Sequence, residues 1–233
     1  QEQNVTVTPN GVKFKRDRQG FLPELMEKFY DERKLWKKKM IEYQIERENC
    51  KDPKRKRELN TLIKRAYNNQ QVRKIALNSA YGALANQYFA FFDPNLAEGI
   101  TTAGQLIIKT AENTINEFLN DTLGTEDEDY VIAMDTDSIY VTFDRMVKHI
   151  FPEDTPKSKI VDFLNNAGQD RILDVLTKGY EDLAFYTNAF QQKMVMGREV
   201  IADRGIWTAK KRYILNVLDN EGVRLTEPKL KMM

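Results

Sequence analysis

The spacing of apolar side chains predicts two long helices near the start of the chain. Apolar positions recur at helical spacing over residues 22–48, among dense charge, and a second helical segment follows over residues 57–81. A basic, proline-containing turn at 51–57 separates the two segments. We expect the second helix to end at Gly82, because glycine is favoured where helices stop. The pattern therefore predicts an antiparallel helical hairpin with a basic tip.

The middle of the chain predicts two more helices and a β-hairpin. Helical spacing returns over residues 96–119 and 157–185. Between them, β-prone runs at 130–134 and 138–143 flank a short acidic turn, which indicates two antiparallel strands.

Further strands are expected near both ends of the chain. Residues 5–14 contain two short extended pieces around a Pro-Asn-Gly turn. Strands are also expected at 193–202 and 208–218, the second closing on a turn at 219–222 with no further element after it. Helices packed on a largely antiparallel sheet, with a projecting helical hairpin, define the α+β class.

Composition narrows the kinds of site that the chain can build. The 233 residues are 41% hydrophobic and 30% charged, which is typical of a globular protein and not of a fibrous or disordered chain. No apolar run approaches the roughly 20 residues needed to cross a bilayer, so we expect no membrane partner. With a single cysteine, Cys50, and a single histidine, His149, neither a disulfide framework nor a Cys/His zinc site can form. Any metal must therefore be held by carboxylates.

The net charge of +1 conceals an uneven distribution. Residues 1–75 hold 20 of the 36 lysines and arginines but only 11 of the 35 acidic residues. This division indicates a basic element that meets phosphates beside an acidic part that holds cations, although solvated helix faces would give the same counts.

Two aspartates at the predicted β-hairpin turn form the first candidate site. Asp135 and Asp137 flank a single residue, and clustered carboxylates at an exposed turn suit Mg²⁺. Two such ions can activate a hydroxyl and stabilise a leaving oxygen in phosphoryl transfer. The alternative is an ordinary turn, in which aspartate is common for its own hydrogen-bonding reasons.

The helical hairpin carries the second candidate site. Lys74, Asn78 and Tyr81 share one helical face, which offers an ammonium, an amide and an aromatic ring. Arg33 and Lys37 form a cationic face on the other helix, so the two helices could clamp a triphosphate. The alternative is a solvated basic face with Tyr81 in the core.

Three motifs in this order resemble those of the family B DNA polymerases, especially those of T-even-type bacteriophages. Lys74 to Gly82 resembles the fingers motif Lys-x-x-x-Asn-Ser-x-Tyr-Gly, and Met134 to Val141 resembles the palm motif Asp-Thr-Asp-Ser. Residues 209–213 (Ala-Lys-Lys-Arg-Tyr) resemble the downstream Lys-Lys-x-Tyr element. The resemblance covers nearly the whole chain.

The resemblance implies roles for the fingers residues. Lys74 would contact the triphosphate and protonate departing pyrophosphate, so it counts as catalytic. Arg33 and Lys37 would hold the outer phosphates. Asn78 and Tyr81 would lie against the nascent base pair.

The same resemblance implies the metal ligands. Asp137 would be the principal ligand, with Asp135 supporting it, for two Mg²⁺ ions for which Mn²⁺ can substitute. Glu199 would lie near these metals at the DNA, or else be an exposed strand residue.

The DNA-binding residues are likewise implied by the family. Lys211 would reach the primer-terminal minor groove, with Lys210 and Tyr213 beside it. The alternative for these lysines is the ordinary charge of an edge strand.

The resemblance also implies parts that this sequence does not contain. The upstream palm motif Asp-x-x-Ser-Leu-Tyr-Pro-Ser does not occur here. We therefore expect a palm segment at 1–21, a fingers hairpin at 22–85 and a palm domain at 86–233. A complementing chain or segment would supply the upstream aspartate, the exonuclease and the thumb.

The expected function is templated addition of deoxynucleoside triphosphates to a primer on primer–template DNA, in the cytoplasm of a host cell if a phage encodes the chain. We expect the chain alone to be nearly inactive. The alternative is a non-catalytic nucleic-acid-binding module derived from a polymerase.

Overall fold

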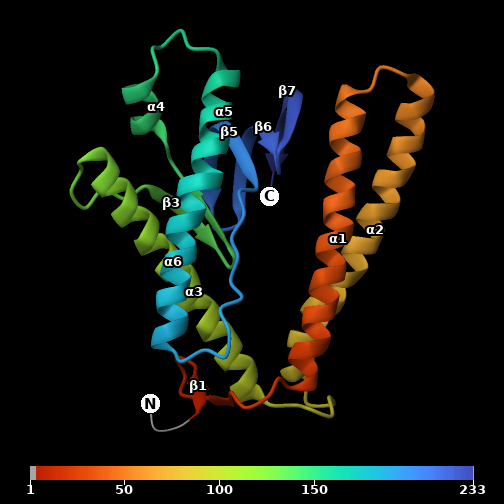
Figure 1. Cartoon of the computed structure of the whole chain (residues 1–233), viewed down its shortest axis with the longest axis vertical. Coiled ribbons are helices and arrows are strands. Elements are labelled where there is room, and N and C mark those ends of the chain that lie inside the picture. The colour runs from red at the N-terminus through yellow and green to blue at the C-terminus, as the bar shows by residue number, and fades with distance from the viewer. Residues whose placement is uncertain (1–3, 233) are drawn as a thin grey trace. The chain divides into compact units, whose positions relative to one another are not determined.

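A computed structural model describes residues 4–232, leaving aside the side chains of residues 168 and 169. It confirms the α+β class, with antiparallel strand pairs among long helices (Figure 1). The described strands form three small sheets, β1–β2, β3–β4 and β5–β6–β7, where one palm sheet was expected. Residues 1–3 and 233 of the expected palm segments lie outside the described part of the chain.

The chain divides into two compact units. The first contains the described residues up to Arg16 together with Glu98–Ile201, and the second contains Asp17–Ala97 together with the described residues from Ala202 onward. We describe each unit by itself.

The first unit packs helices against the β3–β4 hairpin. Its helices are α3 (Pro94–Leu123, which begins in the second unit), α4 (Asp144–Ile150), α5 (Lys157–Ala167) and α6 (Leu173–Tyr186). Its core residues come from α3, α4, α6 and the hairpin: Ala111, Ile115, Leu119, Tyr130, Val131, Met146, Leu176 and Tyr180. Strands β1 (Val5–Val7) and β2 (Lys13–Lys15) confirm the expected extended pieces.

Two features of this unit differ from the sequence prediction. The helix expected at 157–185 is interrupted by a π-helical turn, Gly168–Ile172, between α5 and α6. The short helix α4 was not expected at all.

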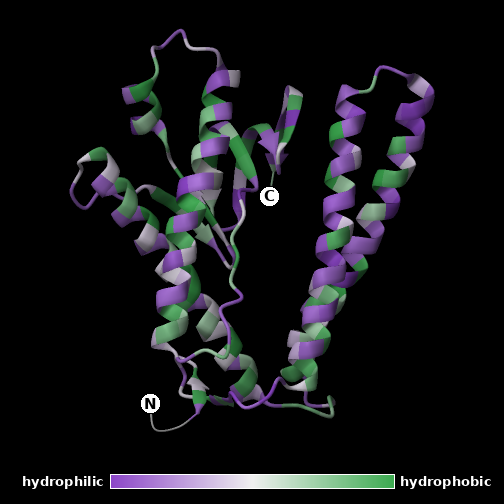
Figure 2. Ribbon diagram, viewed as in Figure 1, coloured by the Kyte–Doolittle hydropathy of each residue, from purple (hydrophilic) through white to green (hydrophobic). Residues whose placement is uncertain are grey.

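The second unit contains the predicted helical hairpin, formed by α1 (Phe21–Asn49) and α2 (Pro53–Leu84). Figure 2 shows both helices dominated by hydrophilic residues, and no residue of α1 is buried. Helix α2 buries only a short stripe, which includes Leu59 and Ala66. This pair of helices therefore has little apolar core of its own.

Helix α2 is longer at both ends than expected. It starts at Pro53, because proline is favoured at the first helical position and Asp52 caps the helix. It continues through Gly82 to Leu84, so the predicted end at Gly82 is wrong. A Cβ at Gly82 would meet nothing within 4 Å, so this glycine is not required by close packing.

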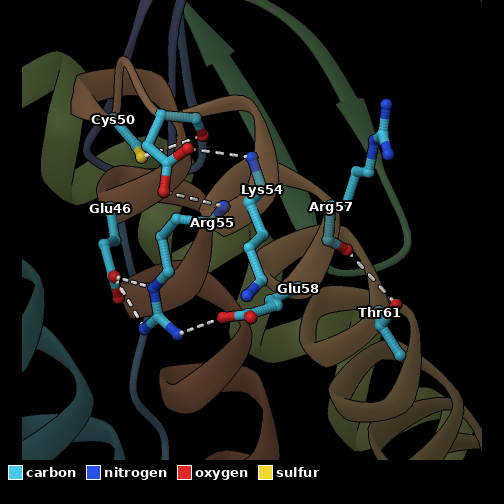
Figure 3. A network of polar contacts seen from close by, with 8 residues as sticks. Glu46, Cys50, Lys54, Arg55, Arg57, Glu58 and Thr61 are labelled. Atoms are coloured by element: carbon cyan, nitrogen blue, oxygen red, sulfur yellow. Dashed lines mark hydrogen bonds and ion pairs between the residues drawn. The ribbon is translucent and has the colours of Figure 1, made fainter.

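The tip of the hairpin is held by a polar network (Figure 3). The Asp52 carboxylate accepts hydrogen bonds from the backbone N–H groups of Lys54 (3.0 Å) and Arg55 (3.3 Å). The Arg55 guanidinium donates hydrogen bonds to the carboxylates of Glu46 (2.8 Å) and Glu58 (3.2 Å), and these bonds raise the pKa of Arg55 above its ordinary value. The predicted basic tip is thus partly neutralised by acidic side chains.

Strands β5 (Val200–Ala209), β6 (Arg212–Asn220) and β7 (Val223–Met232) complete the second unit as a three-stranded sheet in that order, with the first residues of β5 in the first unit. Residues 193–199, expected as strand, are not in a strand. The segment 208–211, expected within a strand, holds the end of β5 and a turn. Strand β7 contradicts the expectation that no element follows residue 222.

Candidate functional site

The acidic turn lies at the end of the β3–β4 hairpin. Strand β3 (Val131–Asp135) pairs antiparallel with β4 (Ser138–Val141), and Asp135 lies opposite Ser138. Thr136 and Asp137 therefore form a two-residue turn, as predicted. Buried Val131 anchors the hairpin in the core of the first unit.

The two aspartates differ in their surroundings. Asp135 accepts a hydrogen bond from Thr136 Oγ1 (3.0 Å), and its backbone carbonyl accepts one from Ser138 Oγ (3.2 Å). Asp137 is exposed, and within residues 4–232 its carboxylate makes neither an ion pair nor a hydrogen bond. Asp137 is therefore the carboxylate available to a cation.

The turn has an unusual backbone conformation. Thr136 has φ of +35°, in the left-handed region, which a β-branched residue rarely adopts. Such strain costs on the order of 1–3 kcal/mol and persists only where the surroundings impose it. Here the paired strands on both sides and the Ser138 hydrogen bond impose it.

The residue types at this turn fit a hard divalent cation, because carboxylate oxygens are the ligands that Mg²⁺ prefers. No cluster of three or more metal-ligating side chains occurs among the residues that the structure describes. In the described part of the chain, Asp135 and Asp137 therefore do not belong to a cluster of three or more such side chains.

The nucleotide-binding candidates occupy the helical hairpin of the second unit. Lys74, Asn78 and Tyr81 all lie in α2 and are exposed, so they share a helical face as predicted. Arg33 and Lys37 lie one turn apart on α1 and are half-buried.

An ion pair joins the two helices and shows which of their residues lie at the same level. Arg73 Nε donates to Glu32 Oε2 at 2.7 Å, and Arg73 Nη1 donates to the backbone carbonyl of Asn69 at 3.0 Å. Arg33 follows Glu32 and Lys74 follows Arg73 in the sequence, so Arg33 and Lys74 lie at similar positions along the hairpin axis. At about 1.5 Å per residue, the five candidates span roughly 20 Å along the hairpin.

Arg33 and Lys37 differ in their surroundings. Arg33 Nε is buried, and no acceptor contacts it within the described residues. Lys37 forms an ion pair with Glu221, in the turn between β6 and β7. Neither Glu221 nor the Glu32–Arg73 pair was singled out from the sequence, because such contacts depend on how distant segments pack.

The third group surrounds the β5–β6 turn. Lys210 and Lys211 form this turn and are exposed, and Lys211 has φ of +61°. Tyr213 is buried in the sheet with its ring centroid 6.4 Å from that of Trp207, so its ring belongs to the core. Glu199 is exposed and lies just before β5, outside any strand.

The candidates fall into both units. Asp135, Asp137 and Glu199 belong to the first unit, and the hairpin residues with Lys210, Lys211 and Tyr213 belong to the second.

Along the described chain, none of the helices combines the length and apolar character that a bilayer-spanning segment requires.

The fold and the candidate site define the class of protein: an α+β chain with an acidic β-turn and a basic helical hairpin. A model of DNA polymerase family B matches residues 1–150, which include the hairpin and the acidic turn. The DNA-directed DNA polymerases of Escherichia phage RB69 and Enterobacteria phage T4 are each 34% identical to the chain over 97% of its length. The chain belongs to DNA polymerase family B.

The chain spans 30% of the length of each of these relatives. The aligned stretches of 274 and 275 positions exceed the 233 residues of the chain, so the relatives contain insertions between residues that are neighbours here.

Proposed function

We propose that this chain is the palm–fingers part of a DNA-directed DNA polymerase, with palm at 1–21 and 86–233 and fingers at 22–85. It would act on primer–template DNA and deoxynucleoside triphosphates in the host cytoplasm. The observation that carries the proposal is the exposed acidic turn of the β3–β4 hairpin, with an unpaired Asp137 carboxylate, in a family B chain.

The acidic turn would hold Mg²⁺ through Asp137 and Asp135. The ions, when bound, would lower the pKa of the primer 3′ hydroxyl and offset charge on the leaving pyrophosphate. Glu199 would contribute a further carboxylate near the primer end. A complementing segment would supply the upstream palm aspartate as a further metal ligand.

The hairpin would bind the incoming nucleotide. The buried, unpartnered Nε of Arg33 supports an anionic ligand there, because a buried donor without an acceptor costs about 1–3 kcal/mol. Lys37 and Lys74 would add charge along the phosphates, and Lys74 would donate a proton to pyrophosphate. Asn78 and Tyr81 would face the base and sugar.

The β5–β6 turn would bind the primer–template duplex. Lys210 and Lys211 are exposed at the end of a hairpin, where ammonium groups can reach phosphates and groove edges. Tyr213 would support this turn from the sheet core by packing near Trp207. Its role in DNA binding would then be one of positioning.

The test is primer extension with Mg²⁺ and all four deoxynucleotides. Four samples are compared: the chain alone, the chain with the flanking segments of the Enterobacteria phage T4 polymerase, and that mixture with Asp137→Asn or Asp121→Asn in the chain. Asp121 is an exposed acid of α3, outside the β3–β4 hairpin, and serves as the matched control. We expect extension only in the complemented samples and a loss of at least about a hundredfold for Asp137→Asn alone.

A complementing mixture that extends primers equally well with Asp137→Asn would contradict the assignment of this aspartate. Salt-sensitive duplex binding without extension, even in a stable complemented complex, would favour the non-catalytic binding module.

A further inference from the structure

The ion pair between Lys37 and Glu221 joins the helical hairpin to the three-stranded sheet within the second unit. Lys37 is one of the cations assigned above to the outer phosphates of a nucleotide. Its ammonium contacts Glu221 Oε1, and the side chains are 38% and 15% exposed. The pair is therefore partly withdrawn from water, and Glu221 more so than Lys37.

Glu221 is held in position by a rigid turn. Glu221 and Gly222 have φ of +52° and +86°, as in the two-residue turns that suit antiparallel strands, and Asn220 pairs with Val223 on either side. The left-handed conformation is unfavourable for glutamate, so the surrounding structure must impose it.

Asp219 supplies that support. Its carboxylate is almost fully buried and accepts hydrogen bonds from the Gly222 N–H (3.0 Å) and from Arg224 Nε (3.4 Å). The turn is thus fixed by its own strands, and Glu221 does not need Lys37 in order to be ordered. The ion pair instead constrains Lys37.

The Glu221 carboxylate and a phosphate group compete for the same Lys37 ammonium. The ammonium has three donors, but the side of it that faces Glu221 cannot also face a phosphate oxygen. A triphosphate must also meet the negative field of Glu221 if the carboxylate stays in place. The ion pair with Glu221 therefore weakens the binding of phosphate at Lys37.

We propose that Glu221 is a latch that occupies Lys37 in the nucleotide-free chain and competes with the triphosphate for it. The inference rests on the proposed nucleotide-binding role of the hairpin. It assigns Glu221 the function of weakening binding at Lys37, so that release of the latch accompanies capture of a nucleotide.

The size of the effect follows from the exposure of the pair. Partly exposed ion pairs contribute up to about 1 kcal/mol, which corresponds to about a fivefold change in an equilibrium constant. Neutralising Glu221 should therefore tighten triphosphate binding about two- to fivefold.

The experiment is calorimetric titration of the full chain with inorganic tripolyphosphate, and separately with dATP, without divalent metal. The variants are E221Q, K37Q and the double variant K37Q/E221Q. E227Q is the matched control, because Glu227 is an exposed glutamate of β7 and its replacement changes the charge equally. Far-UV circular dichroism verifies that each variant is folded.

We expect E221Q to bind tripolyphosphate two- to fivefold more tightly than the unchanged chain, and E227Q to bind as the unchanged chain does. K37Q should weaken binding, and adding E221Q to K37Q should give no further gain, because the competition acts through Lys37.

Two results would overturn the latch while leaving the hairpin's role intact: K37Q weakens binding but E221Q has no effect, or E221Q and E227Q tighten binding equally. If K37Q binds tripolyphosphate as well as the unchanged chain, the phosphate role of Lys37 is wrong and the latch falls with it.

Discussion

The packing of α6 against α3 in the first unit can be tested by replacing two glycines with alanine, one at a time. Gly104 lies in α3 and Gly179 in α6, so each sits within a helix. A Cβ at Gly104 would meet nothing within 4 Å. A Cβ at Gly179 would lie 2.8 Å from Oγ1 and 3.3 Å from Cγ2 of Thr114 on α3.

The expected magnitudes follow from these contacts. Replacing glycine by alanine inside a helix favours folding by about 0.8–1.0 kcal/mol, so Gly104→Ala should stabilise the chain by that amount. Gly179→Ala gains the same helix term but overpacks the contact, which costs about 1–3 kcal/mol. Thr114 cannot relieve the overlap easily, because a β-branched side chain has few rotamers in a helix and both its branches face the added methyl. The two variants should therefore differ by about 1–3 kcal/mol.

Urea denaturation followed by far-UV circular dichroism measures the difference. Both glycines belong to the same compact unit, so they are compared within one structural context. The double variant Thr114→Ala/Gly179→Ala should recover most of the loss, and a double-mutant cycle should assign about 1–3 kcal/mol to the pair. If Gly179→Ala is as stabilising as Gly104→Ala, α6 does not pack on α3 as described.

Three further outcomes test other parts of the fold. Asp52→Ala should lower the free energy of unfolding by about 1 kcal/mol in chemical denaturation through loss of the α2 cap, whereas Asp52→Asn should retain most of it; equal losses would contradict the capping role. Leu119→Ala, in the core of the first unit, should lower the free energy of unfolding by about 2–5 kcal/mol in the same assay. Leu35→Ala, at an exposed position, should lower it by less than about 0.5 kcal/mol, and similar losses for the two variants would contradict the core assignment. Burial raises the pKa of Tyr180, so the folded chain keeps this phenol protonated after the unfolded chain has ionised, and stability is lost as pH rises above the ordinary value of 10.0. Unfolding measured across that range should show a smaller loss for Tyr180→Phe, and parallel curves for the two proteins would contradict the shift.

The two long helices of the basic hairpin and the acidic β-turn were predictable because local patterns determine them. Both long helices of the basic hairpin are found within a few residues of their predicted ranges, since charge density and apolar spacing act within each segment. The β3–β4 turn was predictable from two β-prone runs around a short acidic segment. The start of α2 could also have been found, because Asp52 followed by Pro53 is a helix-start signal.

Strand β7 was missed for a different reason. It contains Pro228, and proline within a run argues against a strand because it cannot donate a ladder hydrogen bond. The observed strand order places β7 at an edge of its sheet, where a missing donor is tolerated. Whether a proline is acceptable therefore depended on a topology that residues 223–232 do not themselves encode.

The Lys-Lys-x-Tyr element shows why the sequence pattern alone did not separate its lysines from its tyrosine. Along β6, Tyr213, Leu215, Val217 and Asp219 are buried, whereas Arg212 before Tyr213 and Ile214 after it are exposed. This alternation with a period of two places Tyr213 on the core face, while the two lysines before it lie in the turn. The same alternation ends at Asp219, whose buried carboxylate fixes the turn that presents Glu221 to Lys37. One strand thus orients the proposed DNA-binding lysines at its start and the proposed latch at its end. Residues 212–219 alone do not show this alternation, because the exposed Ile214 is apolar and the buried Asp219 is charged. The burial pattern, like the pairing of Glu221 with a helix near the other end of the chain, required the tertiary structure.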